Sequence, residues 1–567
     1  MIGPVQEARG NSALVHVFIT YFCIFIDCMS GFHNEYTYRH YVEDGKEPEF
    51  DALFENAVSR VKEEILGKTH YMHIGGEKVS ASATISEYSP IDKTLVGIFQ
   101  RGDAETARRA IGAAQKAFAE WSVLDYRARV AIFQKAADIF SQHKFELAAI
   151  LSIENGKSRY ESVGEVDEAI DFLRYYSMDM IKNRGYLRRA SIASSSARVS
   201  KGFQGAPGSG EKIAIAMKPY GVFGVIAPFN FPVSISMGMS TGAMITGNTV
   251  VFKPSSTDNM AMLTGLQIYN MLTQAGLPAG VFNYVTGPGS TLGEELVTNS
   301  AVKGIAFTGS RGTGLSMIRK TYDLGMQKVF VVEMGGKNPA IVSKYANLDD
   351  AAKGIASAAF GFAGQKCSAC SRTYVHESVK EEFMSKLLDE ARAMKIGDPL
   401  KKENYVGPLI SPGALERYKK AVDEASSVGR VVYGGKQVNT GLSGIYVEPT
   451  IVEAATDSRL MREELFVPIL GISTYRDFGD AIAMANDVGY GLTAGLYSGK
   501  NAEIKEFIRK IEAGVIYVNR SESATTGAIV GAHTFVGWKD SGLSGKGSGS
   551  RFYLQQFMRE QSQAVVK

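Results

Sequence analysis

The chain has 567 residues, of which 45% are apolar and 21% charged, and its net charge is +3. This length exceeds one compact core and predicts two or more domains. Basic and acidic side chains are mixed, and no basic stripe or RNA-binding aromatic motif occurs, which argues against nucleic acid as a partner. Four cysteines in so long a chain argue against a disulfide scaffold and favour a reducing, cytoplasmic setting.

An apolar segment near the start of the chain, Ala13–Ile26, is short for a membrane-spanning helix. It has 14 residues, whereas a bilayer needs about 20. Its length fits a signal-peptide core, but the small-residue cleavage pattern is poor. Two other interpretations are a true start at Met29, which makes 1–28 a wrongly assigned extension, and a genuine extension or anchor. We assign 1–45 as an N-terminal extension and expect no membrane partner.

The first part of the chain carries helical hydrophobic patterns. Apolar residues recur at helical spacing in Glu49–Leu66 and in Asp103–Ser122, whose first residue is a candidate N-cap. The pattern continues through 126–156 and 166–181. The stretch Ala190–Lys212 is small, polar and glycine-rich, which predicts a loop or a hairpin arm that leaves the main body.

Beyond residue 212, short apolar runs alternate with helical patterns. The runs lie at 220–228, 248–255, 280–287, 304–310 and 329–336. β-branched runs followed by helices predict parallel strands with crossover helices, and such a sheet binds its ligand at the carboxyl ends of its strands. The alternation continues less regularly from Gly335 to Arg520, which predicts a second α/β domain.

Two glycine-rich loops are candidate phosphate binders. Residues 285–293 imitate the dinucleotide fingerprint with one residue too many, and Pro288 favours a plain turn. Residues 307–314 follow a strand and open a helix, so Gly309 and Gly314 would let the backbone approach an anion at the helix start. From spacing alone, a turn without a ligand is equally compatible with this second loop. It lacks the Lys-Ser/Thr ending of an NTPase loop, which argues against ATP.

Cys367 and Cys370 stand in a C-x-x-C arrangement. Three interpretations are open: a redox pair, half of a metal site, or one nucleophile with a bystander. No second pair and no histidine cluster in the sequence would complete four metal ligands, so we expect no metal.

Several motifs occur in a fixed order along the chain. They are PFNFP (228–232), FKPSS (252–256), FTGSRGTG (307–314), EMGGKNP (333–339), GQKCSAC (364–370), EELFVP (463–468) and GLTAGLYS (491–498). Together they resemble the aldehyde dehydrogenase superfamily, and the resemblance runs from about Tyr71 to the C-terminus. It implies an α/β fold with a Rossmann-type parallel sheet, a second α/β catalytic domain and a small β oligomerisation arm.

The resemblance also implies a division into domains and a homo-oligomer built from dimers. We expect an NAD(P)-binding domain from 46–189 and 211–333, and a catalytic domain from 334–525. Residues 190–210 and 545–567 would be the oligomerisation strands.

Two stretches, FAGQKCSACSR and TTGAIVGAHTFVGWKDSG, look like the branch that oxidises glutamate γ-semialdehyde, the open form of 1-pyrroline-5-carboxylate, in proline degradation. Another short carboxylated semialdehyde, such as succinate semialdehyde, is the alternative substrate. Two further alternatives are a thiol–disulfide protein that forms a reversible Cys367–Cys370 bond and a catalytically silent homologue. The presence of Cys367, Glu333 and Asn230 together argues against a silent homologue.

The resemblance implies three catalytic residues. Cys367 would be the nucleophile, forming a hemithioacetal and then a thioester. The amide of Asn230 and the backbone N–H of Cys367 would stabilise the oxyanion. Glu333 would activate the water that hydrolyses the thioester. Cys370 has no implied role and is expected to be a small buried residue.

The resemblance implies NAD as cofactor, with Lys253 at the adenosine ribose, Gly309 and Ser310 near the pyrophosphate, and Glu464 at the nicotinamide ribose. Gly314, Phe466 and Ser256 complete the expected cofactor set. Many NAD-preferring members have glutamate at the position of Ser256, where it repels a 2′-phosphate. The serine removes that repulsion, so tolerance of NADP is expected.

For the substrate, the resemblance implies Ser368 and the N–H groups of Gly527 and Ala528 around an α-carboxylate, with Phe535 on the aliphatic chain. The sequence departs from the family pattern at Val467, Thr534 and Val536 and in the longer spacer between Arg520 and Thr526. Thr534, Val536 and the spacer border the expected substrate loop.

Overall fold

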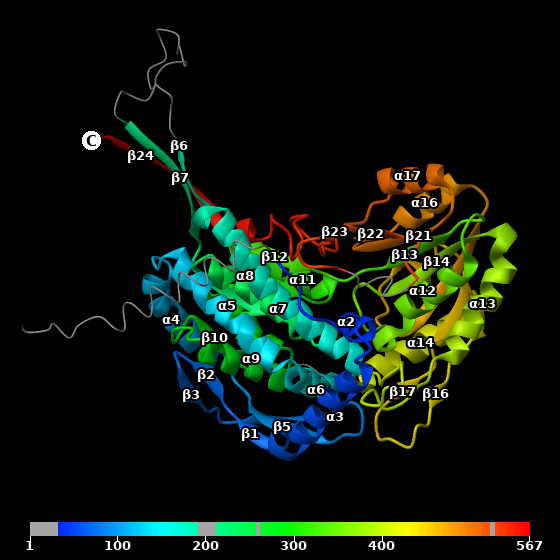
Figure 1. The fold of residues 1–567 in the computed structure, drawn as a ribbon, viewed down its shortest axis with the longest axis horizontal. Helices are drawn as coiled ribbons and strands as arrows, with labels where there is room; N and C mark the ends of the chain where they lie inside the picture. Colours follow the sequence, from blue (N-terminus) through cyan, green and yellow to red (C-terminus); the bar gives the residue numbers. More distant parts are fainter. Residues whose placement is uncertain (1–31, 191–210, 257–260, 522–527, 567) are drawn as a thin grey trace, which may run out of the picture.

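The structure is a computed structural model that describes residues 32–190, 211–256, 261–521 and 528–566. The apolar segment near the start and the alternative start lie outside this range. Figure 1 shows two α/β lobes side by side and a narrow β arm that leaves the first lobe. No helix in the described part of the chain is both long and apolar enough to cross a bilayer.

The five apolar runs beyond residue 212 form adjacent strands of one seven-stranded sheet, in the order β12-β11-β8-β9-β10-β2-β3. The pairs from β12 to β10 are parallel, whereas β2 and β3 join antiparallel. This sheet confirms the predicted Rossmann-type architecture. Its strands are β2 (Met72–Ile74), β3 (Glu77–Val79), β8 (Val222–Ile226), β9 (Thr249–Lys253), β10 (Phe282–Tyr284), β11 (Val302–Thr308) and β12 (Val329–Glu333).

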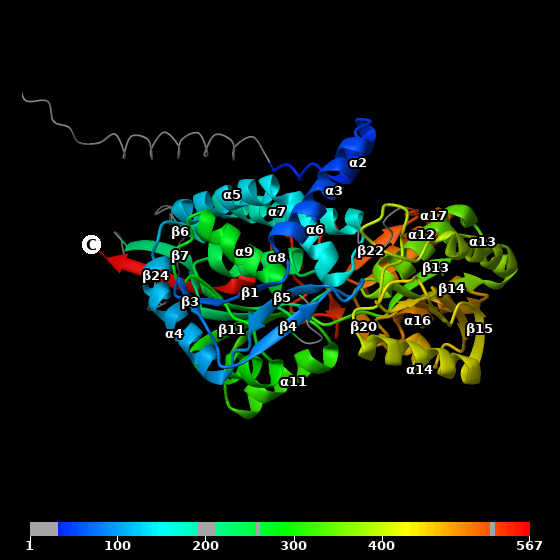
Figure 2. The same ribbon diagram turned by 90° about the horizontal axis from the view of Figure 1, so that it is seen from below.

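Helices cover both faces of this sheet (Figure 2). Successive strand residues alternate between the faces: Val222 packs with α4 and α11, and Phe223 packs with α8 and α9. Because both faces are buried, the strands are continuously apolar rather than alternating. The helices of this lobe are α2 (Tyr38–Glu43), α3 (Glu47–Glu64), α4 (Ala104–Trp121), α5 (Tyr126–Gln142), α6 (Lys144–Asn155), α7 (Arg159–Lys182), α8 (Ser234–Ile245), α9 (Met262–Gln274), α10 (Glu294–Thr298) and α11 (Arg311–Asp323).

The helices predicted at 49–66 and 103–122 correspond to α3 and α4. Asp103 caps α4, because its Oδ1 accepts the Thr106 N–H at 2.9 Å. The predicted helical stretch 126–156 divides into α5 and α6 at His143, which lies outside helical geometry. A small sheet of β1 (Lys68–His70), β4 (Thr84–Tyr88) and β5 (Leu95–Gln100) adjoins this lobe.

The second lobe contains another seven-stranded sheet, in the order β15-β18-β19-β14-β13-β21-β22. All its pairs are parallel except the edge pair of β15 and β18. Its strands are β13 (Asn338–Val342), β14 (Cys370–His376), β15 (Gly429–Tyr433), β18 (Thr450–Ala454), β19 (Ile469–Tyr475), β21 (Thr493–Tyr497) and β22 (Val515–Val518). Its helices are α12 (Leu348–Phe360), α13 (Lys380–Ala393), α14 (Pro412–Val428), α15 (Arg459–Arg462), α16 (Phe478–Asn486) and α17 (Asn501–Lys510). This is the predicted second α/β unit, although the exact domain boundaries stay predictions.

Short elements complete the chain. The strand pairs are β16 (Gln437–Val438) with β17 (Tyr446–Val447), and β20 (Tyr490–Gly491) with β23 (Trp538–Lys539). The short helices are η1 (Arg184–Tyr186), η2 (Gly289–Gly293), η3 (Gly361–Gly364), η4 (Glu377–Val379) and η5 (Leu554–Phe557).

The arm is a three-stranded antiparallel sheet of β6 (Leu187–Ala190), β7 (Glu211–Pro219) and β24 (Met558–Val566). The predicted strand segment 190–210 lies almost wholly outside the described residues, and β6 and β7 flank it. β24 pairs with β7 along its whole length, from Met558 opposite Pro219 to Val566 opposite Glu211. Figure 1 shows the three strands extending away from both lobes.

Candidate active site at the lobe junction

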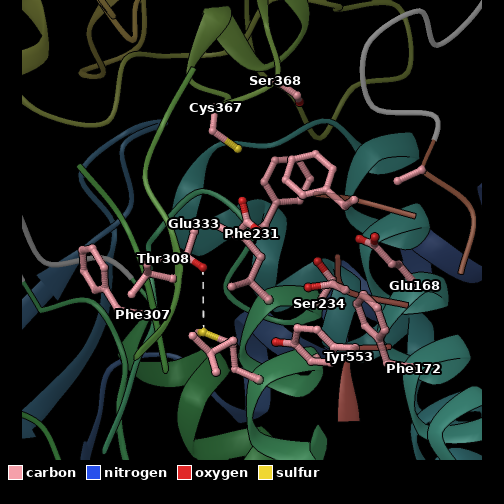
Figure 3. A pocket seen from close by; sticks show the side chains of 18 residues that line it. Glu168, Phe172, Phe231, Ser234, Phe307, Thr308, Glu333, Cys367, Ser368 and Tyr553 are labelled. Atoms are coloured by element: carbon pink, nitrogen blue, oxygen red, sulfur yellow. Dashed lines mark hydrogen bonds between the residues drawn. The ribbon is translucent and has the colours of Figure 1, made fainter. Parts of the chain in front are cut away.

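The elements that carry the predicted catalytic residues meet where the two lobes join. Asn230 follows β8, Glu333 ends β12, and Cys367 lies between η3 and β14. Cys367, Glu333 and the predicted substrate residue Ser368 line one cavity. Figure 3 shows the sulfur of Cys367 directed into it.

The other residues of this cavity, here named the thiol pocket, come from both lobes and from the chain after residue 527. Predicted residues among them are Ala528 and Phe535. Gly527 lies outside the described residues. Sequence reasoning missed Glu168, Phe172, Phe231, Ser234 and Tyr553, which also line the pocket.

A sequence signal existed for only part of this missed set. Phe231 lies inside the PFNFP motif, next to the predicted catalytic residue Asn230. Glu168 lies within a helical pattern that gives no sign of facing a cavity rather than solvent. Burial raises the pKa of the Glu168 carboxyl to about 7.

The environment of the Cys367 side chain favours the thiol over the thiolate. Burial raises its pKa above the ordinary range, and the carboxylates of Glu464 and Glu333 raise it further. The N–H groups of Cys367 and Ser368 act in the opposite direction. Its main-chain carbonyl accepts the Asn338 amide at 2.7 Å, which fixes the loop that carries the sulfur. The thiol therefore needs a nearby base before it can act as a nucleophile.

Cys370 belongs to the core of the second lobe and does not line the thiol pocket. It is 1% exposed and packs with Tyr497 and Tyr517. Burial raises its pKa to about 11. Cys367 and Cys370 are both free thiols. Their settings differ, since only Cys367 faces the pocket.

Glu333 lines the pocket and has one carboxyl oxygen without a hydrogen-bond partner. Its Oε2 is buried and unpaired, and burial raises the pKa of the carboxyl to about 8, against a hydrogen bond from the Gly537 backbone. A Cβ at Gly537 would lie 2.6 Å from Oε2, so glycine there leaves room for this carboxylate. A carboxyl with this pKa can act as a proton acceptor once it has lost its own proton, so its basic form becomes abundant as the pH rises through about 8.

The Asn230 side chain reaches across the junction. It is 3% exposed, and its Nδ2 donates to the carbonyl of Gln365 at 3.1 Å. Gln365 stands two residues before Cys367 in the same loop. The amide is thus bound to the segment that carries the thiol.

A second cavity, here named the glycine-loop cavity, lies along the first lobe and is lined by Lys253. Both glycine-rich loops contribute to it, through Gly289 and Gly293 from one and Gly312 and Thr313 from the other. Two glycines of residues 285–293 therefore line a cavity, and the plain-turn interpretation of this loop stays a prediction.

The start of α11 supplies polar groups at this cavity. Ser310 caps the helix, with its Oγ accepting the Thr313 N–H at 3.2 Å. Gly309 and Gly314 serve packing: a Cβ at these positions would lie 2.4 Å from the Phe307 ring and 2.3 Å from Met334 Sδ. Their absent side chains admit neighbouring side chains. The expected approach of the backbone to an anion stays a prediction.

Lys253 and Ser256 join the end of β9 to the first glycine loop. Lys253 Nζ donates to the Pro254 carbonyl at 2.9 Å and lies 3.3 Å from Ser256 Oγ. Ser256 Oγ in turn donates to the Gly287 carbonyl at 2.5 Å. Burial lowers the pKa of Lys253 to about 8. A buried cation beside helix N–H groups suits an anionic or polyhydroxyl ligand such as a dinucleotide.

Glu464 and Phe466 lie apart from Lys253, in a small cavity behind the Cys367 loop. Glu464 Oε1 accepts the Gly336 N–H at 2.9 Å, and burial raises its pKa to about 7. Phe466 has a left-handed φ of 58° and packs edge-on against Phe229. The structure does not gather all predicted cofactor residues around a single cavity.

The first lobe has a parallel sheet covered on both faces and a glycine-loop cavity. It meets the second α/β lobe at a thiol, a carboxyl and an amide. This combination is that of a nucleotide-dependent aldehyde dehydrogenase. The model of the aldehyde dehydrogenase family matches residues 78–562, and the chain belongs to that family. It uses NAD(P). The family membership removes a thiol–disulfide protein as the class of this chain.

Relatives and solved structures agree with this assignment. The chain is 36% identical over 503 residues to 1-pyrroline-5-carboxylate dehydrogenase 1 of Halalkalibacterium halodurans, covering 88% of this chain and 93% of that protein. The 1-pyrroline-5-carboxylate dehydrogenase from Thermus with bound NAD is 31% identical, with a TM-score of 0.85 over 95% of this chain and 99% of that one. Proline utilization A from Bdellovibrio bacteriovorus is 31% identical, with a TM-score of 0.85 over 94% of this chain and 53% of that one.

Proposed function

We propose that this chain oxidises L-glutamate γ-semialdehyde, the open form of 1-pyrroline-5-carboxylate, to L-glutamate with NAD or NADP, as a step of proline degradation. One observation carries the proposal: the pocket that holds the Cys367 thiol and the unpaired Glu333 carboxyl is also lined by polar groups remote from them. The names of the relatives that cover most of this chain support the same substrate.

The thiol pocket suits a short substrate that carries both charges. Ser368 and Ala528 line one part of it, where a hydroxyl and backbone N–H groups can bind an α-carboxylate. Glu168 lines another part, where a carboxylate can face an α-ammonium. The aromatic rings of Phe231 and Phe535 supply apolar surface for the methylene chain between the aldehyde and the α-carbon.

The first step uses Cys367, Asn230 and a base. The thiol loses its proton and its sulfur attacks the aldehyde carbon, which places a negative charge on the former carbonyl oxygen. The Asn230 amide and the Cys367 N–H donate to that oxygen. Loss of the hydride from this carbon gives the thioester on Cys367, and NAD(P) would supply the acceptor for that hydride. Lys253, Ser310 and the two glycine loops would hold the cofactor.

The second step uses Glu333. Its carboxylate takes a proton from a water, whose oxygen attacks the thioester carbon. The carbon–sulfur bond breaks, glutamate leaves, and Cys367 recovers its proton. The unpaired Oε2 and the pKa of about 8 suit this acceptor role.

The exposed β arm supports a homo-oligomer built from dimers, because Leu187, Ile215 and Val565 leave apolar side chains on its surface. A reducing, cytoplasmic setting suits a mechanism that needs Cys367 as a free thiol.

The substrate is tested by NAD reduction against a panel of aldehydes. We expect kcat/KM for glutamate γ-semialdehyde to exceed that for succinate semialdehyde by about 10-fold or more, since the latter lacks the ammonium that Glu168 faces. Propanal is the uncharged control. A higher kcat/KM for succinate semialdehyde than for glutamate γ-semialdehyde would overturn the proposed substrate.

Cys367→Ala should abolish dehydrogenase turnover, whereas Cys370→Ala should retain most of it. The reason is that only Cys367 faces the pocket, while Cys370 packs in the core. Steady-state NADH production measures both variants, and circular dichroism checks their folding. Equal loss in two folded variants would favour a dithiol mechanism.

Glu333→Gln should slow turnover by about 10²-fold, as expected for removal of a general base. The thioester on Cys367 should then accumulate, visible as a burst of NADH and as a mass increase. In the wild type, the deacylation rate should rise with pH through about 8, because the carboxyl must lose its proton to act. A variant with wild-type kcat would remove Glu333 from the mechanism.

Ser256→Glu should lower activity with NADP much more than activity with NAD. A carboxylate beside Lys253 would repel a 2′-phosphate, and the present serine does not. Ser256→Gln is the matched uncharged control. A wild-type enzyme that rejects NADP would show that another group excludes it.

A further inference from the structure

Lys157 is a fully buried cation beside the segment that carries Asn230. It lies just after α6, beyond Gly156, whose left-handed φ of 77° turns the chain. Its Nζ donates to the main-chain carbonyl of Asn230 at 2.5 Å and forms an ion pair with Glu165 of α7. Both side chains of the pair are 0% exposed.

Glu165 holds the other end of the same segment. Its Oε1 accepts the N–H of Val233 at 2.7 Å and that of Ser234 at 3.3 Å, at the start of α8. Between these two anchors, the Lys157 ammonium lies 3.6 Å from the centre of the Phe231 ring. One ion pair therefore contacts Asn230 and three of the four residues that follow it, Phe231, Val233 and Ser234.

A third contact fixes the residue before Asn230. Asn155, the last residue of α6, donates from Nδ2 to the Phe229 carbonyl at 3.3 Å. Its Oδ1 accepts the Lys157 N–H at 3.1 Å, which ties the two side chains to one turn. With the backbone held on both sides, the direction of the Asn230 side chain depends on its own torsions and on its hydrogen bond to the Gln365 carbonyl.

The same helix also holds the thiol side of the junction. Glu161 lies one turn before Glu165 on α7 and pairs with Lys366, the residue that precedes Cys367. Positions four apart lie on one face of a helix, so the two carboxylates face the junction together. Both groups proposed to donate to the oxyanion, the Asn230 amide and the Cys367 N–H, are thus attached to α7 through a lysine.

We propose that Lys157 and Glu165 are positioning residues that aim the Asn230 amide at the oxyanion; this rests on the role proposed above for Asn230. Stability alone does not call for this pair, because a well-packed apolar pair of similar size is often as stable as a buried ion pair. The pair instead supplies directional hydrogen bonds to the backbone at Asn230 and at the two residues that begin α8.

A double-mutant cycle tests the proposal. Asn230→Ala should lower kcat by about 10²-fold, the usual cost of one oxyanion donor. Lys157→Met alone should lower kcat by about 10-fold or more on the same scale, with the dissociation constant for NAD unchanged. In the Asn230→Ala background, Lys157→Met should cost less than about threefold, because the group it aims is gone.

Lys144→Met is the matched control. Lys144 is 5% exposed, lies on α6 and pairs with Asp167 of α7 at 3.0 Å. Its Nζ donates to the Tyr36 carbonyl rather than to the Asn230 segment. This variant should lose thermal stability much as Lys157→Met does, yet keep kcat within about twofold. A loss of kcat equal to that of Lys157→Met would overturn the proposal, since any buried lysine would then serve.

The outcomes separate this proposal from the proposed function. If Lys157→Met costs the same factor in both backgrounds, it does not act through Asn230, and the positioning role is overturned while the function stands. If Asn230→Ala keeps wild-type kcat, the oxyanion role itself falls. Where Lys157→Met does not fold, the Lys157→Met/Glu165→Gln pair removes both buried charges at once and carries the same cycle.

Discussion

Burial of ionisable groups at the lobe junction is the constraint on which the structure of the site depends. A thiol and two carboxyl groups are withdrawn from water around Cys367, and their pKa values rise together. A charge that forms there has few waters to stabilise it, so fixed donors must take that role. The loops of both lobes supply these hydrogen-bond donors at the junction.

The surrounding framework is itself partly ionic. Helix α7 runs past the junction with Glu161, Glu165 and Glu168 on successive turns, two of them paired with lysines and the third lining the pocket. Such pairs depend on each other, because removing one partner leaves an isolated buried charge, which costs several kcal/mol. The site therefore behaves as one connected unit rather than as separate residues.

Much of the fold could be predicted from sequence, because strands buried on both faces leave long apolar runs and helices leave a clear periodicity. Asp103 could be predicted as a cap from its position alone. The catalytic residues Cys367, Glu333 and Asn230 could be predicted from the order of the motifs along the chain rather than from residue spacing alone. By contrast, Glu168 and Glu165 lie in an ordinary helical pattern, and only the tertiary structure shows that both face the junction. Likewise, only the tertiary structure shows that Gly289 and Gly293 line the glycine-loop cavity.

The β arm has a consequence for synthesis of the chain. β7 is made before most of the first sheet and all of the second, but its partner β24 follows both lobes. Until then one edge of β7 has no strand to pair with, and Ile215 stays exposed even in the finished arm. A growing chain thus carries an open strand edge for most of its translation, the kind of edge on which chains associate wrongly. Ribosome-associated chaperones would bind this unpaired edge of β7.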